Sequence, residues 1–482
     1  MVFSSHLFLF YFLPLALLVY YAMPRRGKHV ALTLLSYGFY GWANPYFVFL
    51  MLFSTVVDYF CGLVIAEAPL FGRDPIFALP KGGARIRRQK TALAVSICTN
   101  LGLLGFFKYF NFGVDSFNAL AQALGQEGWD TFWRVTLPLG ISFYTFQSMS
   151  YSIDVYRGDA KAIRNFTDFS CYVAMFPQLV AGPIVRFHEV ATQIGRRAHT
   201  LEKFSRGTAF FALGMAKKVL LANPCGKIAD MVFEAGSATA LDAWFGATAY
   251  GFQIYFDFSA YSDMAIGLGL FFGFVFPKNF DSPYLSRSIT EFWQRWHLSL
   301  SNWLRDYLYI PLGGNRKGAR RTYVNLALVM LLGGLWHGAA WNFVLWGGIH
   351  GAMLAFERAQ GKDSPYRNLP APFRTAITFL IVTLAWVFFR AADLRSAFAF
   401  IANMFGAGPR QDGTGLVGGL IYQPYYLLFF AAAALVAWRA PQTWDFTRRL
   451  TWPKAAYCLG MLILSIVVLT SQAFNPFIYF MF

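Results

Sequence analysis

Two histidine motifs in this chain carry the residue types that could do chemistry. One is Trp293-Gln294-Arg295-Trp296-His297, and the other is Gly333-Gly334-Leu335-Trp336-His337-Gly338. Each places an imidazole beside tryptophan in a chain whose composition otherwise suits a lipid bilayer. Ionisable side chains are costly in hydrocarbon, so both histidines are candidates for a functional site. A neutral imidazole accepts a proton near neutral pH, which makes proton transfer the chemistry that these residues indicate.

The pattern alone leaves three roles open for His297 and His337, namely catalysis, a structural hydrogen bond and metal ligation. A metal needs three or four donors, and the chain has no His-x-x-x-His pair and no cysteine cluster. We therefore expect no metal. His350 follows His337 by thirteen residues, about 220° around an ideal continuous helix, so we expect these two side chains to face different ways.

The composition predicts an all-α, polytopic membrane protein. Hydrophobic residues make up 57% of the 482 residues and charged residues only 13%. Together with shorter apolar stretches, the long ones predict roughly 10–12 transmembrane helices in a single domain over 1–482. The start of the chain has no basic region and no cleavage pattern, so its first segment is expected to be a retained helix. The long apolar segments are 4–22, 45–66, 91–112, 134–156, 373–391, 420–438 and 455–474.

Charge distribution predicts the topology of these segments. The chain carries a net charge of +17, and its basic residues gather in 67–90, 157–164, 186–206 and 277–322. By the positive-inside rule these stretches face the cytoplasm. The 113–133 loop holds acidic residues and no lysine or arginine, so we expect it outside. The N-terminus is then also outside, and 29–66 forms a hairpin that turns at Asn44-Pro45.

Segment 166–185 is long enough to cross the membrane, yet basic stretches flank it on both sides. Pro177, Gly182 and Pro183 lie within it. A broken, re-entrant segment resolves this conflict. Broken backbone at membrane depth must be satisfied by protein or by a water-filled cavity, which predicts an interior channel.

The two intramembrane carboxylates Asp257 and Asp263 are six residues apart, so a continuous helix places them on different faces. We expect each to be satisfied by structural hydrogen bonds.

His337 follows the start of its apolar stretch at Tyr323 by fourteen residues, about 21 Å of helix, which carries it near the bilayer midplane. His297 starts from the cytoplasmic side, so one shared channel is the simplest geometry for both histidines.

Through these motifs the chain resembles the membrane-bound O-acyltransferases. Trp336-His337-Gly338, with His297 in an Arg-Trp-His-x-Ser setting, is similar to the signature of that family. The branch that acts in bacterial alginate O-acetylation is the most similar, and the likeness covers most of the chain. The final hundred residues match less distinctively, and Ala260 stands where the family usually has glycine. Other matching stretches are 1–5, 111–113, 137–143, 181–183, 255–263, 288–293, 303–315 and 331–338.

The resemblance implies an enzyme that takes an acyl group from a cytoplasmic thioester and passes it across the membrane to a hydroxyl. It places the catalytic role on His337, with His297 orienting the acceptor or donating to the developing oxyanion. The basic region attracts the phosphates of a coenzyme A donor, although simple positive-inside bias explains it equally well. Beyond the histidines, we predict substrate contacts for Trp336, Trp296, Arg295, Arg305, Asp306 and Tyr309.

The function that we expect is O-acetylation of a secreted exopolysaccharide at the bacterial inner membrane. Alginate is the first choice of glycan, and acetyl-CoA is the expected donor, with no permanently bound cofactor. The expected partners are the bilayer, an exopolysaccharide synthesis and export complex, and a periplasmic acetyltransferase or acceptor protein, but no nucleic acid. Bacterial cellulose or another glycan is the alternative within the family, and D-alanylation of teichoic acid comes behind it. A transporter or polymer-export channel is the alternative from another class.

The predicted topology can be tested by labelling single cysteines from outside, in a background without the native cysteines. A probe at Ser116 should be modified, because the 113–133 loop faces outward. Probes at Gly83 and Thr192 should be spared, because both lie in basic cytoplasmic stretches. Strong external labelling at Thr192 would reject the re-entrant interpretation of 166–185.

Overall fold

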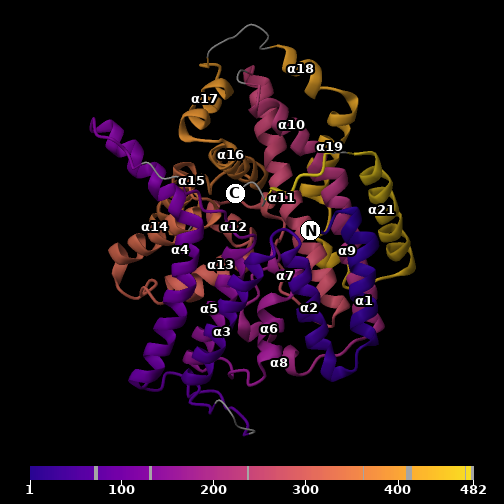
Figure 1. Cartoon of the computed structure of the whole chain (residues 1–482). Helices are drawn as coiled ribbons and strands as arrows, with labels where there is room; N and C mark the ends of the chain where they lie inside the picture. The colour runs from indigo at the N-terminus through magenta and orange to yellow at the C-terminus, as the bar shows by residue number, and fades with distance from the viewer. Residues whose placement is uncertain are drawn as a thin grey trace. The chain divides into compact units, whose positions relative to one another are not determined.

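A computed structural model describes residues 1–69, 74–129, 133–235, 238–361, 363–408, 415–472 and 474–478. Throughout these residues the only regular elements are helices, which confirms the all-α prediction (Figure 1). The chain divides into two compact units. Unit 1 comprises Met1–Phe204 and Leu268–Pro277, and unit 2 comprises Ser205–Gly267 and Lys278–Phe482. The single domain over 1–482 stays a prediction.

Unit 1 contains the first helices of the chain. The hairpin predicted at Asn44-Pro45 is confirmed, because α2 ends at Gly41 and α3 begins at Tyr46. The long helix α4 covers 37 residues, about 55 Å, and continues eleven residues past the predicted end at 112. The helices are η1 (Phe8–Phe12), α1 (Leu13–Ala22), η2 (Arg25–Gly27), α2 (Lys28–Gly41), α3 (Tyr46–Ile65), α4 (Arg87–Ala123), α5 (Ile141–Arg157), α6 (Phe166–Ala174), α7 (Phe176–Leu179) and α8 (Phe187–Gly195).

Polar side chains hold α3, α4 and α5 together inside unit 1, where the three helices lie side by side (Figure 1). Asp58 of α3 is fully buried and accepts hydrogen bonds from Ser96 Oγ at 2.6 Å and from Asn100 Nδ2 at 2.8 Å. Ser96 Oγ also lies 2.8 Å from Ser152 Oγ of α5. A buried carboxylate must be satisfied, and here the neighbouring helices supply the donors.

The segment 166–185 is broken, as its prolines predict. Helix α6 ends at Ala174, and the single turn α7 covers Phe176–Leu179 before the chain leaves helical geometry. Gln178 Nε2 donates to the carbonyl oxygen of Tyr172 at 2.5 Å, so a side chain replaces part of the lost helical bonding. The break is confirmed, and the re-entrant path through a membrane stays a prediction.

Four helices are long and apolar enough to cross a membrane, among the residues that the structure describes. They are α3, α4, α16 (Ala371–Arg390) and α21 (Trp452–Ser471). Two shorter apolar helices cover Phe8–Ala22 and Pro424–Arg439. Six of the seven long apolar segments expected from the sequence coincide with these helices. The seventh, 134–156, contains α5, which begins only at Ile141 and is not among them. The count of roughly 10–12 crossings stays a prediction, because it rests on the shorter helices as well.

Unit 2 is built around the long helix α11. Its two carboxylates are satisfied separately, as expected. Asp257 lies 2.7 Å from Lys218 Nζ, and Asp263 lies 2.7 Å from Lys217 Nζ. The helices are α9 (Leu201–Ala216), η3 (Lys217–Ala222), α10 (Asn223–Phe233), α11 (Ala240–Phe271), η4 (Pro283–Leu285), α12 (Ile289–Trp293), α13 (Leu298–Leu304), η5 (Arg305–Tyr309), α14 (Gly318–His337), α15 (Trp341–Ala359), α16, α17 (Leu394–Met404), α18 (Leu416–Ile421), α19 (Pro424–Arg439), α20 (Thr443–Phe446) and α21.

Helices α14 and α15 form a hairpin whose backbones touch. A Cβ atom on Gly334 would lie 2.2 Å from the carbonyl oxygen of Phe343, and one on Gly347 would lie 2.3 Å from that of Met330. Both distances are far below any real carbon contact. Only glycine therefore allows the approach that fixes the end of α14 against α15.

Gly347→Ala should destabilise the protein by about 1–3 kcal/mol, because the added methyl group must push the two backbones apart. The neighbouring Gly348→Ala is the matched control, since its Cβ would meet only Leu331 Cδ2 at 3.7 Å. Thermal unfolding of both variants in detergent is the measurement. Equal unfolding midpoints for the two variants would contradict the proposed contact.

Candidate active site

His337 lies at the last position of α14, with 7% of its surface exposed. The apolar stretch from Tyr323 is helical as far as this residue, as the sequence predicts. Gly338 leaves the helix in an extended conformation, and a Cβ there would lie 2.2 Å from the ring of Phe343. Because His337 is the last residue of α14, its imidazole lies at the C-terminal end of the helix, where unpaired backbone carbonyl groups favour positive charge.

His297 is completely buried between α12 and α13. Its backbone has φ 45°, the left-handed region that a non-glycine residue seldom occupies. Such strain persists only where the surrounding structure enforces it, and it is concentrated at functional positions. The ring centroids of His297 and His337 are 6.3 Å apart. The structure therefore brings together the two histidines that the sequence singles out.

Asn279 fixes the protonation of the His297 ring. Asn279 Oδ1 accepts from the backbone N–H of Ser299 at 3.2 Å and from Ser299 Oγ at 2.9 Å, so this atom is the acceptor of the amide. His297 Nδ1 lies 3.1 Å from the same oxygen and must donate to it. Asn279 Nδ2 donates to Ser262 Oγ at 3.0 Å, which holds the amide in place. His297 Nε2 is then left as an acceptor.

His297 Nε2 is buried and has no hydrogen-bond partner within the described parts of the chain. A buried polar atom without a partner costs free energy comparable to a lost hydrogen bond. Other buried atoms of unit 2, among them His350 Nε2 and Trp346 Nε1, are in the same state. His297 differs from them in its strained backbone and in its ring centroid distance of 6.3 Å to His337, which make its Nε2 a candidate binding atom.

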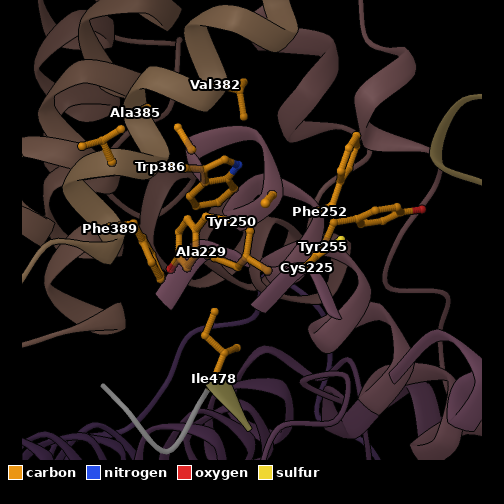
Figure 2. Packing of buried hydrophobic residues seen from close by; sticks show 14 of the residues in the cluster. Cys225, Ala229, Tyr250, Phe252, Tyr255, Val382, Ala385, Trp386, Phe389 and Ile478 are labelled. Atoms are coloured by element: carbon orange, nitrogen blue, oxygen red, sulfur yellow. The ribbon is translucent and has the colours of Figure 1, made fainter. Parts of the chain in front are cut away.

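Aromatic side chains enclose the two histidines. The His337 ring contacts Trp336, Trp346 and Phe389 at centroid distances of 5.0, 5.3 and 5.3 Å. The His297 ring meets Phe258 edge-on at 4.6 Å. Figure 2 shows Trp386 and Phe389 within the larger hydrophobic core that continues from this wall. Such an apolar wall excludes water and strengthens polar interactions within the site.

The structure places the two predicted tryptophans differently. Trp336 is 6.0 Å from the His297 ring and belongs to the site. Trp296 is turned into the core, where its ring packs against Trp386 at 5.0 Å and Phe280 at 5.1 Å. Trp296 is therefore part of the packing beneath the site. Its direct contact with substrate stays a prediction, which this packing disfavours.

Three of the polar residues predicted to contact substrate, Arg295, Arg305 and Asp306, are already paired with other groups of the protein. Arg295 donates to Glu291 and to the carbonyl oxygen of Asp281, with a shortest distance of 2.8 Å. Arg305 makes a two-pronged ion pair with Asp306 at 2.7 and 3.0 Å. Tyr309, at the end of the π-helix η5, is half-buried and packs near Gly314. None of these pairings was included in the sequence prediction, and substrate binding by these residues stays untested.

His350 illustrates a limit of helical reasoning. The angle of about 220° assumed one continuous helix, but the chain breaks after His337, and His350 lies on α15. Its ring contacts Trp346 at 4.9 Å and its Nδ1 accepts from Trp293 Nε1 at 3.3 Å. His350 thus packs against Trp346, the tryptophan that also contacts His337.

His188, which the sequence leaves without a role, lies in unit 1. Its Nδ1 is 2.9 Å from the buried carboxylate of Asp154. This hydrogen bond raises the pKa of His188 above its usual value.

The residue that sequence reasoning missed at the site is Asn279, which lies in a short connection and carries no motif of its own. Within the described residues, no three histidine, cysteine or acidic side chains group closely enough to hold a metal ion.

Comparison with known proteins places this site in a family. The model of the membrane-bound O-acyltransferase family matches residues 159–392, which include both histidines. A probable alginate O-acetylase of Azotobacter vinelandii is 44% identical over the full length of both chains. The chain belongs to the membrane-bound O-acyltransferase family. It is an acyltransferase and a membrane protein, as the resemblance implied.

Two further relatives show the range of acceptors in the family. A probable alginate O-acetylase of Pseudomonas putida is 45% identical over the full length of both chains. A peptidoglycan O-acetyltransferase of Helicobacter pylori is 36% identical over 84% of this chain and 80% of its own. Transfer of an acetyl group to a hydroxyl of a polymer is common to these names.

Asn279→Ala should lower the acyltransfer rate by roughly 10²-fold, because the His297 ring loses the acceptor that fixes its tautomer and orientation. Asn279→Asp keeps an oxygen at this position and should retain more activity. Ser262→Ala is the control, since it removes the support of the amide and leaves Oδ1 in place. Equal rates for Asn279→Ala and wild type, at equal abundance in the membrane, would exclude the role of Asn279.

Proposed function

We propose that this protein moves an acetyl group from cytoplasmic acetyl-CoA across the bacterial inner membrane for O-acetylation of a secreted polysaccharide, with alginate as the leading acceptor. The pairing of two buried histidines carries the proposal, together with full-length similarity of 44–45% to proteins named as probable alginate O-acetylases. Acetyl-CoA fits as donor because a thioester carbonyl is open to attack by a hydroxyl activated by a neutral imidazole.

In this reaction His337 takes the proton of the attacking hydroxyl. The oxygen then adds to the thioester carbonyl, the carbon–sulfur bond breaks, and the leaving thiolate takes the proton from His337 while the acetyl group stays on the oxygen. Because the attacking hydroxyl donates its single proton to His337, His297 Nε2 accepts a hydrogen bond from a second donor of the acceptor molecule and so positions it. The ring centroids are 6.3 Å apart, so one acceptor molecule can contact both histidines.

The phosphates of an anionic acetyl-CoA donor would be attracted by basic side chains that are exposed and unpaired. Arg295 and Arg305 already face carboxylates, which weakens their part in the sequence prediction. The side chains of Arg316, just before α14, and Arg320, in its first turn, are exposed and make no hydrogen bond or ion pair within the described residues. We therefore assign the phosphate contacts of coenzyme A to the start of α14, on the helix that carries His337.

The acceptor and the partners complete the proposal. A separate periplasmic acetyltransferase or acceptor protein receives the acetyl group and works beside the polysaccharide synthesis and export complex. Peptidoglycan is the second candidate acceptor, because the Helicobacter pylori relative with that name is 36% identical over most of both chains. Acetylation of bacterial cellulose remains the further alternative within the family.

His337→Ala should nearly abolish acetyl transfer. Removing a general base costs about 10²–10⁴-fold in rate, or roughly 3–5 kcal/mol of transition-state stabilisation. His297→Ala should also reduce transfer severely, and His350→Ala should reduce it less. The measurements are hydrolysis or transfer of labelled acetyl-CoA by purified protein, and the acetyl content of the secreted polysaccharide.

Each variant must first match the wild type in membrane abundance and in monodispersity in detergent, since all three side chains are buried. Normal acetylation by a well-folded His337→Ala protein would remove the base from the mechanism. Transfer from acetyl-CoA without acetylated alginate, but with acetylated peptidoglycan, would keep the enzyme and change the acceptor.

A further inference from the structure

A groove runs between α3 and α4 on the surface of unit 1, and none of its residues belongs to the histidine site. Its volume is about 640 Å³. Both helices are long and apolar enough to cross a membrane. Phe60 is 45% and Val95 46% exposed, so the wall of the groove is open to whatever surrounds the helices. The side chains that form this wall are Phe60, Cys61, Val64, Thr91, Ala92 and Val95.

Two arginines close one end of the groove. Arg87 and Arg88 are the first two residues of α4, and both line the groove. Gln89 Nε2 donates to the carbonyl oxygen of Ile65 at 2.9 Å, which ties the start of α4 to the last residue of α3. The apolar span of α3 ends where the arginines begin. The guanidinium groups therefore lie at the level where a bilayer changes from hydrocarbon to headgroups.

Two basic residues of the preceding loop, Arg85 and Lys81, are already engaged, whereas Arg87 and Arg88 are not. Arg85 donates to the carbonyl oxygens of Tyr156 and Pro80 at 2.7 and 2.9 Å. Lys81 pairs with Asp159 at 2.8 Å. Arg87 and Arg88 are exposed and make no hydrogen bond or ion pair with the described part of the chain. Two adjacent cations thus remain available at the end of an apolar groove.

We propose that this groove binds one anionic diacyl phospholipid. An acyl chain lies along the wall formed by α3 and α4, and the phosphate is held by Arg87 and Arg88. Charge-assisted hydrogen bonds from guanidinium to phosphate are strong, and the start of a helix adds partial positive charge. Basic pockets between membrane helices recognise anionic headgroups for the same reason.

The combination of wall and cations selects this ligand over two others. A soluble phosphate would use the arginines and leave the apolar wall unfilled. A membrane helix from a partner protein would fill the wall and leave two cations without a counter-charge. From Arg88 to Val95 the groove follows about 10 Å of α4, the depth at which an acyl chain begins beneath its headgroup.

The test uses the full-length protein, purified in an uncharged detergent and supplied with phosphatidylglycerol, phosphatidylcholine or glycerol 1-phosphate. Native mass spectrometry should show one retained phosphatidylglycerol, and this lipid alone should raise the unfolding midpoint. Arg87→Gln with Arg88→Gln should weaken retention about 10- to 30-fold. Arg25→Gln with Arg26→Gln is the matched control, because it removes two exposed charges from another loop and should change nothing.

Two further variants separate the proposal from a loss of folding. Arg87→Lys with Arg88→Lys keeps both charges and should retain much of the binding. Thr91→Trp keeps both arginines, fills the groove and should displace the lipid. Unchanged lipid retention in the Arg87→Gln, Arg88→Gln protein would overturn the proposal. Equal binding of phosphatidylcholine would do the same, and an equal effect of glycerol 1-phosphate would show a soluble anion site instead.

Discussion

The close approach of α14 and α15 is the constraint on which the site depends. Gly334 and Gly347 let the two backbones touch at distances that any side chain would prevent. The chain can then leave α14 directly after His337 and return as α15, which brings Trp346 against the imidazole. The position of the catalytic candidate is thus set by backbone packing and not by a flexible loop, which is the arrangement that precise catalysis requires.

Burial of polar groups separates structural from functional positions in unit 2. Asp257 and Asp263 are each paired with a lysine from the π-helix η3, so their charges are compensated inside the protein. His297 is equally buried, but its network with Asn279 satisfies only one ring nitrogen. A substrate that donates a hydrogen bond would offset the cost of the other nitrogen. His350 Nε2 and Trp346 Nε1 are buried without a partner as well, so the position of His297 beside His337 is what distinguishes its ring.

The sequence predicts what depends on local pattern and misses what depends on tertiary contact. Apolar runs predict the helices because burial in lipid needs about twenty residues, and Pro177 predicts the break because proline cannot continue the backbone bonding. The pairing of Arg295 with Glu291, four residues earlier, is a contact that helical spacing permits. Asn279 and the inward turn of Trp296 could not be predicted, because only the packing of separate helices brings their partners to them.

The surroundings of the two imidazoles assign them different parts in the reaction. Asn279 holds the proton of His297 on Nδ1, so Nε2 accepts a hydrogen bond and cannot donate one to an oxyanion. An uncharged amide also gives little support to a protonated ring. His337 lies at the carbonyl end of a twenty-residue helix, where positive charge is favoured. A proton taken from the attacking hydroxyl is therefore better held on His337, while His297 Nε2 accepts a hydrogen bond from another donor of the acceptor molecule.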